Sequence, residues 1–397
     1  MDPELLQRFA EVEASIQAPM SQAEAFRHFA RLNPAFQDAH TLLMPILGDA
    51  PDRDRGLFPF RVRLDPRGTL HVRESWVRAG DGVRLDAGAQ IVSINAVATA
   101  DLLDELAAYG HGETRELQRY MLTVMFPKWL SAVRGWRDEF EIGLDTQAEL
   151  RRVRIARDDV WSPHSSQASS SLPILELQDD DIAWLRLPTF NVEKAVEPYR
   201  EAVDAAFARI RGSRTRALII DVRGNTGGQS DAGAYVIRYL IDRPIKQVSR
   251  AREKLNEDNR GLFGYLGKVG ELREIDVSRD ESIEPVSSAM RFDGTVVLLI
   301  DAMTYSAGIL FATALQDHGI AVVTGQPTGG YANQTGNMEP VYLPHSRLLA
   351  HIPAREFVRP SGDESVAPVT PDIVVDPALP GPDPVLAAAV TYLKEAT

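Results

Sequence analysis

The sequence predicts an α/β fold in its carboxyl-terminal half, preceded by a strand-rich module and by a helical segment. Three observations predict this order. Apolar runs of the kind found in buried strands alternate with helical patterns from residue 174 onward. Alternating apolar and polar residues, as in FPFRVRL, occur between residues 57 and 157, and this alternation is typical of half-buried strands. Apolar residues among the first 36 positions recur at helical spacing.

Composition excludes several classes of protein. The 397 residues allow two or three domains. The 43 Lys and Arg residues against 56 Asp and Glu leave a net charge of −13, which argues against nucleic acid as the main partner because phosphate binding needs basic patches. The absence of cysteine excludes disulfides, thiolate metal sites and a cysteine nucleophile. No apolar stretch approaches the roughly 18 residues of a membrane span, and the first residues do not resemble a signal peptide.

The first predicted segment, residues 1–56, is helical over its first 36 residues. Its apolar residues fall at spacings that can share one helix face, namely Phe9, Val12, Ile16, Phe26 and Phe29. The sequence QDAHTLL, which contains His40, ends the helical region, and an irregular stretch rich in Pro and Gly follows.

The strand-rich module is predicted to span residues 57–160. Its most structured part, LDAGAQIVSINAVATADLLDELAAYG, indicates a glycine-containing turn, a strand, a short turn and a helix that Asp101 could cap. The Ser-rich residues 161–173 are predicted to be a linker.

Residues 174–397 are predicted to form the α/β core. Strand–helix–strand repeats of this length predict right-handed crossovers and a mostly parallel inner sheet. The predicted strands lie in DIAWLRLPTF, RALIIDVRG, GTVVLLID and IAVVTG, and the predicted helices cover residues 193–212, 230–242, 307–317 and 384–396.

Ser306 is the first candidate for chemistry, because it stands where a buried-type strand stops and a helix begins. Amide groups at the start of a helix carry partial positive charge and can hold a developing oxyanion. Ala307 and Gly308 have little side chain, so a substrate carbonyl could approach closely. The alternative is that Ser306 is an ordinary helix cap, since serine is a favoured residue there.

A second stretch, IIDVRGNTGGQSD, also runs from a buried-type strand through glycine-rich backbone into a helix. Gly227 and Gly228 could supply further oxyanion donors. The stretch lacks the Gly-Lys-Ser/Thr of a phosphate-binding loop, and a plain turn remains the alternative. Asp221 and Arg223 are expected to pin neighbouring loops, and Asn225 to orient the glycine turn.

Together, IIDVRGNTGG, VVLLIDAMTYSAGILFATALQDHG, VVTGQPTGG and VAPVTPDIVVD resemble the core of the S41 serine peptidases, the tail-specific or C-terminal processing family. The resemblance implies a ClpP/crotonase-like ββα core at residues 174–397. The module at residues 57–160 resembles the PDZ-like domain that is inserted in such proteins. The helical segment 1–56, which carries His40, would precede both.

The chain departs from the branch of this family that uses a Ser–Lys dyad. Gly330 and Tyr331 stand where the lysine might fall, and no lysine occurs between Lys268 and Lys394. Histidine is the expected substitute, because its ordinary pKa suits a general base.

Resemblance to the Tricorn-like branch, which carries an Asp-x-His-Thr type segment, implies that His40 is the base. A loop or core histidine is the alternative reading of His40. The same resemblance implies an acidic residue of SGDESVAPVTPDI as the group that orients the imidazole. Glu364 is the expected residue, and Asp363 is the alternative.

The sequence thus predicts a serine endopeptidase that cleaves peptides or unfolded proteins through an acyl-enzyme, with no metal and no cofactor. Its predicted site residues are Ser306, His40 and Glu364, with oxyanion donors at Gly227, Gly228 and Ala307. Two other functions stay open: an S41-like protein that binds a ligand or peptide without cleaving it, and a crotonase-type acyl-CoA enzyme. The expected location is the periplasm or another extracytoplasmic compartment, with the cytoplasm open.

Overall fold

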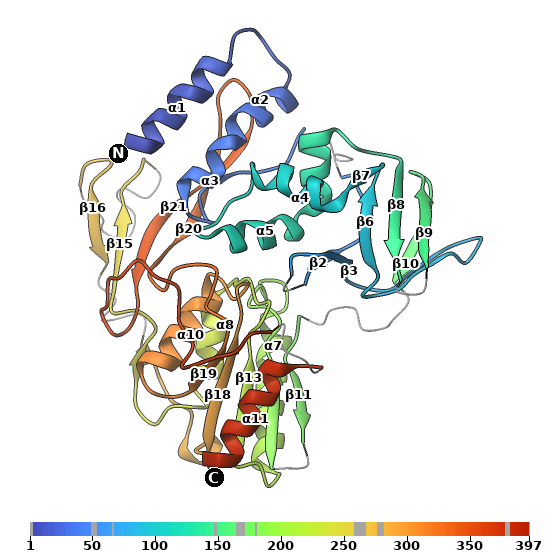
Figure 1. Ribbon diagram of the computed structural model, residues 1–397. Helices are drawn as coiled ribbons and strands as arrows, with labels where there is room; N and C mark the ends of the chain where they lie inside the picture. The colour runs from blue at the N-terminus through green and yellow to red at the C-terminus, as the bar shows by residue number, and fades with distance from the viewer. Residues whose placement is uncertain are drawn as a thin grey trace. The chain divides into compact units, whose positions relative to one another are not determined.

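The computed structural model describes residues 3–48, 54–65, 67–146, 149–163, 171–178, 181–257, 267–275, 282–377 and 382–396. Residues 164–170 of the predicted linker lie outside this part of the chain. The chain forms two compact units (Figure 1). The first comprises residues 1–168 and 338–352, and the second comprises residues 169–337 and 353–397. The domains predicted from the sequence, 1–56, 57–160, 161–173 and 174–397, remain a prediction.

The first unit begins with helices, as the sequence predicts. They are α1 (Pro3–Ser15), α2 (Gln22–Phe29), a short 3-10 turn (Ala30–Leu32) and α3 (Asn33–Phe36). Ser21 and Glu24 form a capping box that fixes the start of α2. After α3 the chain turns at Gln37, which has a φ of 49°. This turn leads directly into the segment that carries His40.

An antiparallel sheet and several helices complete the first unit. The sheet has the order β2 (Val62–Leu64), β3 (Leu70–Val72), β6 (Gln90–Ile94), β8 (Phe140–Asp145) and β9 (Leu150–Ile155), with β7 (Val97–Ala98) beside β6. A smaller sheet joins β10 (Trp161–Pro163), β4 (Trp76–Arg78) and β5 (Arg84–Leu85). The helices are α4 (Thr99–Ala107), α5 (Arg115–Val124), α6 (Phe126–Trp129) and a π-helical turn (Leu130–Arg134).

The prediction that Asp101 caps α4 is wrong. The helix begins two residues earlier, so Asp101 lies in its first turn, and the N-cap position belongs to Ala98. An acidic residue in the first turn still interacts favourably with the helix dipole. The position is therefore explained by electrostatics rather than by a capping hydrogen bond.

The second unit is built on a six-stranded sheet, and its α/β class is confirmed. The spatial order is β11 (Ile174–Leu177), β12 (Ile182–Arg186), β13 (Ala217–Asp221), β18 (Thr295–Ile300), β19 (Val322–Gly325) and β22 (Ile373–Val374). All neighbours from β12 to β22 are parallel, and β11 runs antiparallel to β12. The helices are α7 (Val196–Arg211), α8 (Ser230–Ile237), α10 (Ala307–Asp317) and α11 (Pro384–Ala396).

The central strands β13 and β18 are buried on both faces, which explains their continuous apolar sequence. On one face, Ile219 and Leu299 pack with Val385 and Leu393 of α11. Helices α8 and α10 contact each other, and α10 contacts β18 and β19. Because β13 and β18 are parallel neighbours, the loops that follow them leave the same edge of the sheet. These loops are the glycine-rich stretch and the Ser306 segment.

Short antiparallel pairings fix the segments around the sheet. In the second unit, β15 (Arg250–Lys254) pairs with residues 355–358 of β21 (Leu349–Val358) and with β16 (Leu272–Ile275), while β14 (Ile245–Lys246) pairs with β17 (Ser282–Ile283). In the first unit, β1 (Leu42–Leu43) pairs with residues 350–351 of β21. Strand β20 (Gln334–Tyr342) also pairs with β21.

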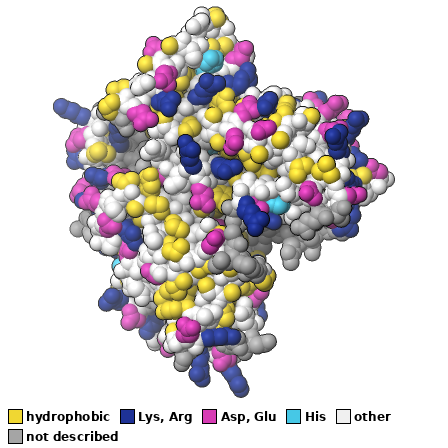
Figure 2. Space-filling view, viewed as in Figure 1, with side chains coloured by type: hydrophobic (Ala, Val, Ile, Leu, Met, Phe, Trp, Pro, Cys, Tyr) yellow, Lys and Arg dark blue, Asp and Glu magenta, His cyan; other side chains and the backbone are white. Residues whose placement is uncertain are grey.

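The described helices include none that is long and apolar enough to cross a membrane. On the face shown in Figure 2, acidic side chains are interspersed with basic ones. A surface that binds nucleic acid typically gathers its basic residues into one patch or stripe.

Candidate active site

Ser306 occupies a strained backbone conformation between β18 and α10. Its φ is 53° and its ψ is −122°, a region that residues other than glycine rarely adopt. Such a conformation costs on the order of 1–3 kcal/mol and persists only where the surroundings enforce it. Ser306 holds the N-cap position of α10, but its side chain makes no cap hydrogen bond. The alternative of an ordinary helix cap therefore finds no support.

Asp301 organises the loop that leads to Ser306. Its Oδ1 atom accepts hydrogen bonds from the backbone N–H groups of Gly224, Met303 and Thr304, at 2.9, 3.0 and 3.0 Å. Burial raises the pKa of Asp301, and the N–H groups oppose that shift. Because Gly224 belongs to the glycine-rich stretch, one carboxylate oxygen joins both loops.

Gly227 lies against Ser306 so closely that no side chain fits between them. A Cβ atom on Gly227 would stand 2.7 Å from the Cβ of Ser306 and 2.9 Å from the backbone nitrogen of Ala307. A Cβ on Gly228 would stand 2.2 Å from the backbone nitrogen of Asn191. Both glycines have positive φ, 95° and 136°. Glycine at 227 therefore lets the glycine-rich stretch approach the Ser306 loop, and glycine at 228 lets it approach the backbone of Phe190 and Asn191.

The backbone N–H groups of Gly227, Gly228 and Ala307 differ in their hydrogen-bond partners. That of Gly227 donates to Asn225 Oδ1 at 2.9 Å, and Asn225 Nδ2 in turn donates to Leu187 O at 2.9 Å. Asn225 thus orients the glycine turn, as predicted. Among the described residues, the N–H groups of Gly228 and Ala307 have no hydrogen-bond acceptor. These two N–H groups are the available donors.

Asp221 and Arg223 are structural, as the sequence predicts. Both Nε and Nη2 of Arg223 donate to the carboxylate of Asp221, at 2.9 and 2.7 Å, and the same guanidinium bonds Asp383 at 2.8 and 2.9 Å. Burial lowers the pKa of Arg223, but its bonds to the two carboxylates outweigh this and raise it overall. The clamp connects the end of β13 to the start of α11.

Sequence reasoning missed Gln334, which holds the Ser306 backbone. Its Nε2 atom donates to Ser306 O at 2.9 Å, and its Oε1 atom is buried without a partner among the described residues. A hydrogen bond to the carbonyl of a strained residue helps to fix its peptide plane. The two residues are 28 positions apart, and no motif in the sequence connects them.

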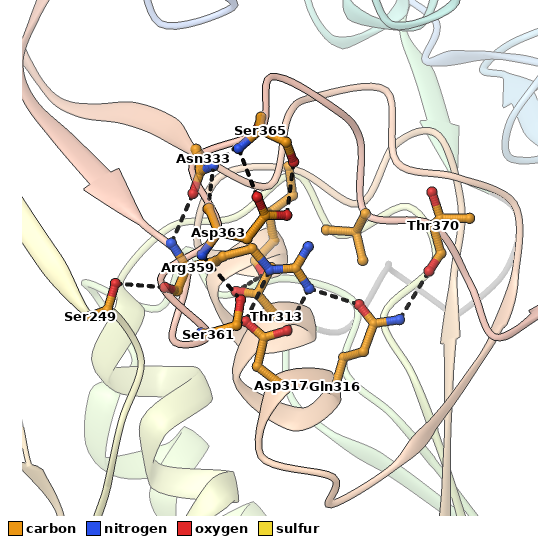
Figure 3. Close-up of polar contacts among 12 residues, drawn as sticks. Ser249, Thr313, Gln316, Asp317, Asn333, Arg359, Ser361, Asp363, Ser365 and Thr370 are labelled. Carbon is orange, nitrogen blue, oxygen red and sulfur yellow. Dashed lines mark hydrogen bonds and ion pairs between the residues drawn. The ribbon is translucent and has the colours of Figure 1, made fainter.

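Glu364 and Asp363, the acidic residues expected to orient the base, lie on a loop of the second unit. Figure 3 shows Asp363 and the contacts that hold this loop. Glu364 is 57% exposed and forms an ion pair with Arg250 at 2.5 Å. The carboxylate of Asp363 accepts hydrogen bonds from Ser365. Arg359 anchors the start of the loop to α10 through two bonds to Asp317, at 2.5 and 2.9 Å.

His40 lies in the first unit beside a carboxylate that the sequence analysis did not select. Its Nδ1 atom is 3.6 Å from Asp38 Oδ1, and its backbone N–H donates to the same oxygen at 2.9 Å. Burial raises the pKa of Asp38, but hydrogen bonds from His40 and Thr41 outweigh it and hold that pKa below its usual value. The DAHT segment, which supplied His40, contains this partner two residues earlier.

A second imidazole, His111, shares the surroundings of Asp38 and His40. His111 is fully buried, and burial together with the charge of His40 lowers its pKa to about 4. Its Nδ1 atom has no partner among the described residues. Asn33 connects the two segments, since its Nδ2 donates to both Leu43 O and Tyr109 O, at 3.1 and 3.0 Å.

The structure thus brings Ser306, Ala307 and Gly227 together within the second unit, which also contains Gly228 and Glu364. His40 belongs to the first unit. Within the described part of the chain, no three His, Asp or Glu side chains gather so that they could hold a metal ion.

Comparison with known proteins assigns a family to the range that contains the parallel strands of the central sheet and the Ser306 loop. Residues 181–375 match the model of peptidase family S41. The chain belongs to peptidase family S41. The matched range contains Ser306, Gly227, Gly228 and Glu364.

The S41 relatives are distant and longer than the matched region. The chloroplastic carboxyl-terminal-processing peptidase 2 of Arabidopsis thaliana is 25% identical over 233 residues, which are 58% of this chain and 39% of that protein. The tail-specific protease of Haemophilus influenzae is 22% identical over 198 residues, which are 50% of this chain and 24% of that protein. The match therefore spans well under half of each relative.

A solved structure supports the S41 fold over nearly the whole chain. Mature CPAF complexed with lactacystin superposes with a TM-score of 0.62 at 15% sequence identity, covering 98% of this chain and 91% of that chain. At this identity the likeness shows the fold alone.

Proposed function

We propose that this S41 protein is a serine endopeptidase that cleaves peptides or unfolded proteins through an acyl-enzyme on Ser306. The observation that carries the proposal is the strained Ser306 itself. Its hydroxyl does not cap α10, and its backbone lies against a glycine turn beside two unengaged N–H groups. Strain of this kind is concentrated at functional sites.

In the proposed mechanism, Ser306 Oγ attacks the peptide carbonyl carbon while His40 takes the hydroxyl proton. His40 then gives that proton to the leaving amine. Nε2 is the atom assigned to the transfer, because Nδ1 lies beside Asp38 Oδ1. We assign Asp38 as the group that orients the imidazole, and Glu364 is the alternative that the sequence predicts. The mechanism requires His40 to reach Ser306.

The oxyanion would be held by the N–H groups of Gly228 and Ala307. Each donor of this type contributes about 3–4 kcal/mol to transition-state stabilisation. Gly227, whose own N–H is bound by Asn225, would act through the close approach that it permits. The first unit is proposed to contain a PDZ-like module that binds an extended peptide by strand addition. An extracytoplasmic location stays a prediction.

The test combines a covalent probe with a cleavage assay. The wild-type protein should be labelled by a fluorophosphonate at Ser306 and should cleave a denatured protein substrate. Ser306→Ala should lose both activities, and His40→Gln should lose nearly all of both. Ser287→Ala is the matched control, because Ser287 also holds an N-cap position without a cap bond. Cleavage that survives in pure Ser306→Ala protein would rule out this nucleophile.

One observation favours a second function, the binding of a peptide or ligand without cleavage. No lysine is present between Lys268 and Lys394 to serve a Ser–Lys dyad. Tight peptide binding without labelling of Ser306 would support this second function over the first.

A further inference from the structure

A groove in the second unit runs beside α8 and has no role in the proposed chemistry. Its volume is about 430 Å³, within the range of about 300–1,000 Å³ that is usual for ligand pockets. Ala234 and Arg238 line it from α8, while Arg355 and Phe357 line it from β21. Leu310 of α10 lines it as well.

The groove begins next to both proposed oxyanion donors. Ser230, which lines it, is two residues after Gly228. The N–H group of Leu310 donates to Ser306 O at 3.1 Å, so Leu310 lies one helical turn after the nucleophile. One turn of α-helix rises about 5.4 Å. A side chain next to a scissile carbonyl held at Ser306 could therefore enter the groove.

Part of the groove surface is apolar. Leu310 and Phe357 pack against the buried Val248, and both are only partly buried themselves. Apolar surface that stays in contact with water is stabilised when an apolar group covers it, by about 25 cal/mol per Å². A large aliphatic or aromatic side chain is the group that fits this surface.

The rim of the groove carries guanidinium groups. The Cζ atoms of Arg200 and Arg238 lie 5.4 and 5.3 Å from the ring centroid of Tyr235. Arg238 donates from Nε to Glu284 O, and no carboxylate of the described residues forms an ion pair with it. Asp231 and Glu284 also line the groove, but neither carboxylate forms an ion pair with Arg238 among the described residues, so the Arg238 guanidinium still repels a second cation placed next to it. Peptide residues with basic side chains are therefore disfavoured here.

We propose that this groove binds a large apolar side chain of the peptide substrate next to the scissile bond, and that its arginine rim disfavours Lys and Arg. The proposal rests on the peptidase function proposed above. In this proposal, Ala234, Leu310 and Phe357 determine how large the substrate side chain can be. Arg238 disfavours a substrate side chain that carries positive charge.

The first experiment fills the groove. Short internally quenched peptides of Ala, Gly and Ser carry one Phe, one Leu or one Lys, and mass spectrometry locates the cleaved bond. Wild type should cleave next to Phe or Leu. Ala234→Phe should lower kcat/KM for these peptides at least tenfold, because one methylene in an apolar pocket is worth about 10–200-fold. Fluorophosphonate labelling of Ser306 should persist, since that probe has a small side group.

Ala208→Phe, on the exposed surface of α7, is the matched control and should behave as wild type. Equal kcat/KM values in Ala234→Phe and wild type would overturn the groove proposal and leave the peptidase proposal intact. A wild-type protein that neither cleaves nor becomes labelled would overturn the peptidase function, and the role of the groove with it.

The second experiment reverses the rim charge and does not depend on Ala234→Phe folding. In Arg238→Glu, the ratio of kcat/KM for the Lys peptide to that for the Phe peptide should rise about tenfold, which corresponds to about 1.4 kcal/mol. Arg209→Glu, on the exposed surface of α7, makes the same charge change elsewhere and should leave the ratio unchanged. An unchanged ratio in Arg238→Glu would overturn the role of the rim.

Discussion

The strained backbone of Ser306 predicts an unusual outcome for two substitutions that both remove the hydroxyl. Ser306→Ala keeps a Cβ atom at a φ of 53° and a ψ of −122°, so it keeps the strain. Ser306→Gly removes the Cβ and with it the strain. Neither variant can form an acyl-enzyme. The glycine variant should therefore be equally inactive but more stable than the alanine variant.

The magnitude follows from a comparison with Ser287. Ser287 also holds an N-cap position without a side-chain cap bond, but its φ is −54° and its ψ is 146°, which any residue adopts. The entropy that glycine adds to the unfolded chain and its preference at the N-cap apply at both sites, so both cancel. The remaining difference is the strain at Ser306, about 1–3 kcal/mol in favour of Ser306→Gly.

The measurement is urea-dependent hydrogen exchange of the peptides that cover β13 and β18. These strands are buried, so exchange of their amides requires the central sheet of the second unit to unfold. Four variants are compared, Gly and Ala at each site. If glycine and alanine differ by the same amount at Ser306 as at Ser287, the strain argument is refuted.

Three further predictions concern titratable groups and their partners. The pKa of His111 is about 4 in the folded protein, against an ordinary value of 6.5 in the unfolded chain. Between pH 6.5 and pH 4, only the unfolded state therefore binds a proton on this imidazole. The free energy of unfolding falls as the pH falls through this range, by about 3 kcal/mol in all. In urea unfolding at pH 7 and pH 4.5, His111→Leu should lose this part of the pH dependence. An equal fall in the free energy of unfolding in the variant and the wild type would contradict the prediction. Asp383→Asn leaves Arg223 with one carboxylate and should lower the unfolding free energy of the second unit by about 1–2 kcal/mol in the same exchange assay, whereas no change would show that the clamp adds nothing. Asp38→Asn should lower kcat on the order of 10²–10⁴-fold with little change in KM, because His40 loses its orienting acceptor; an unaltered kcat would point to Glu364 instead.

The sequence predicted the central sheet well, for a physical reason. Strands β13 and β18 are buried on both faces, so their apolar runs stand out from any amphipathic pattern. The helix over residues 307–317 matches α10 at both ends. The helix expected over residues 230–242 ends at Ile237, because residues 238–240 form a turn that keeps a similar apolar pattern.

One feature of the fold and one of the candidate site were harder to predict. Strand β20 is largely exposed beyond Gly336, so it shows no periodic burial that would have predicted the return of residues 338–352 to the first unit. Asp38 could not be predicted as the partner of His40, because the family resemblance implies an acidic residue near the closing strand, such as Glu364. Its contact with His40 depends on a turn that no periodicity reveals.

The bonds to Asp301 have a consequence for protein engineering. One oxygen atom fixes the backbone at position 224 and at positions 303 and 304. An insertion in either segment would displace the other, so the nucleophile and its donors cannot be adjusted separately. Library designs that vary both segments together, with Asp301 kept, therefore have a better prospect than designs that vary one at a time.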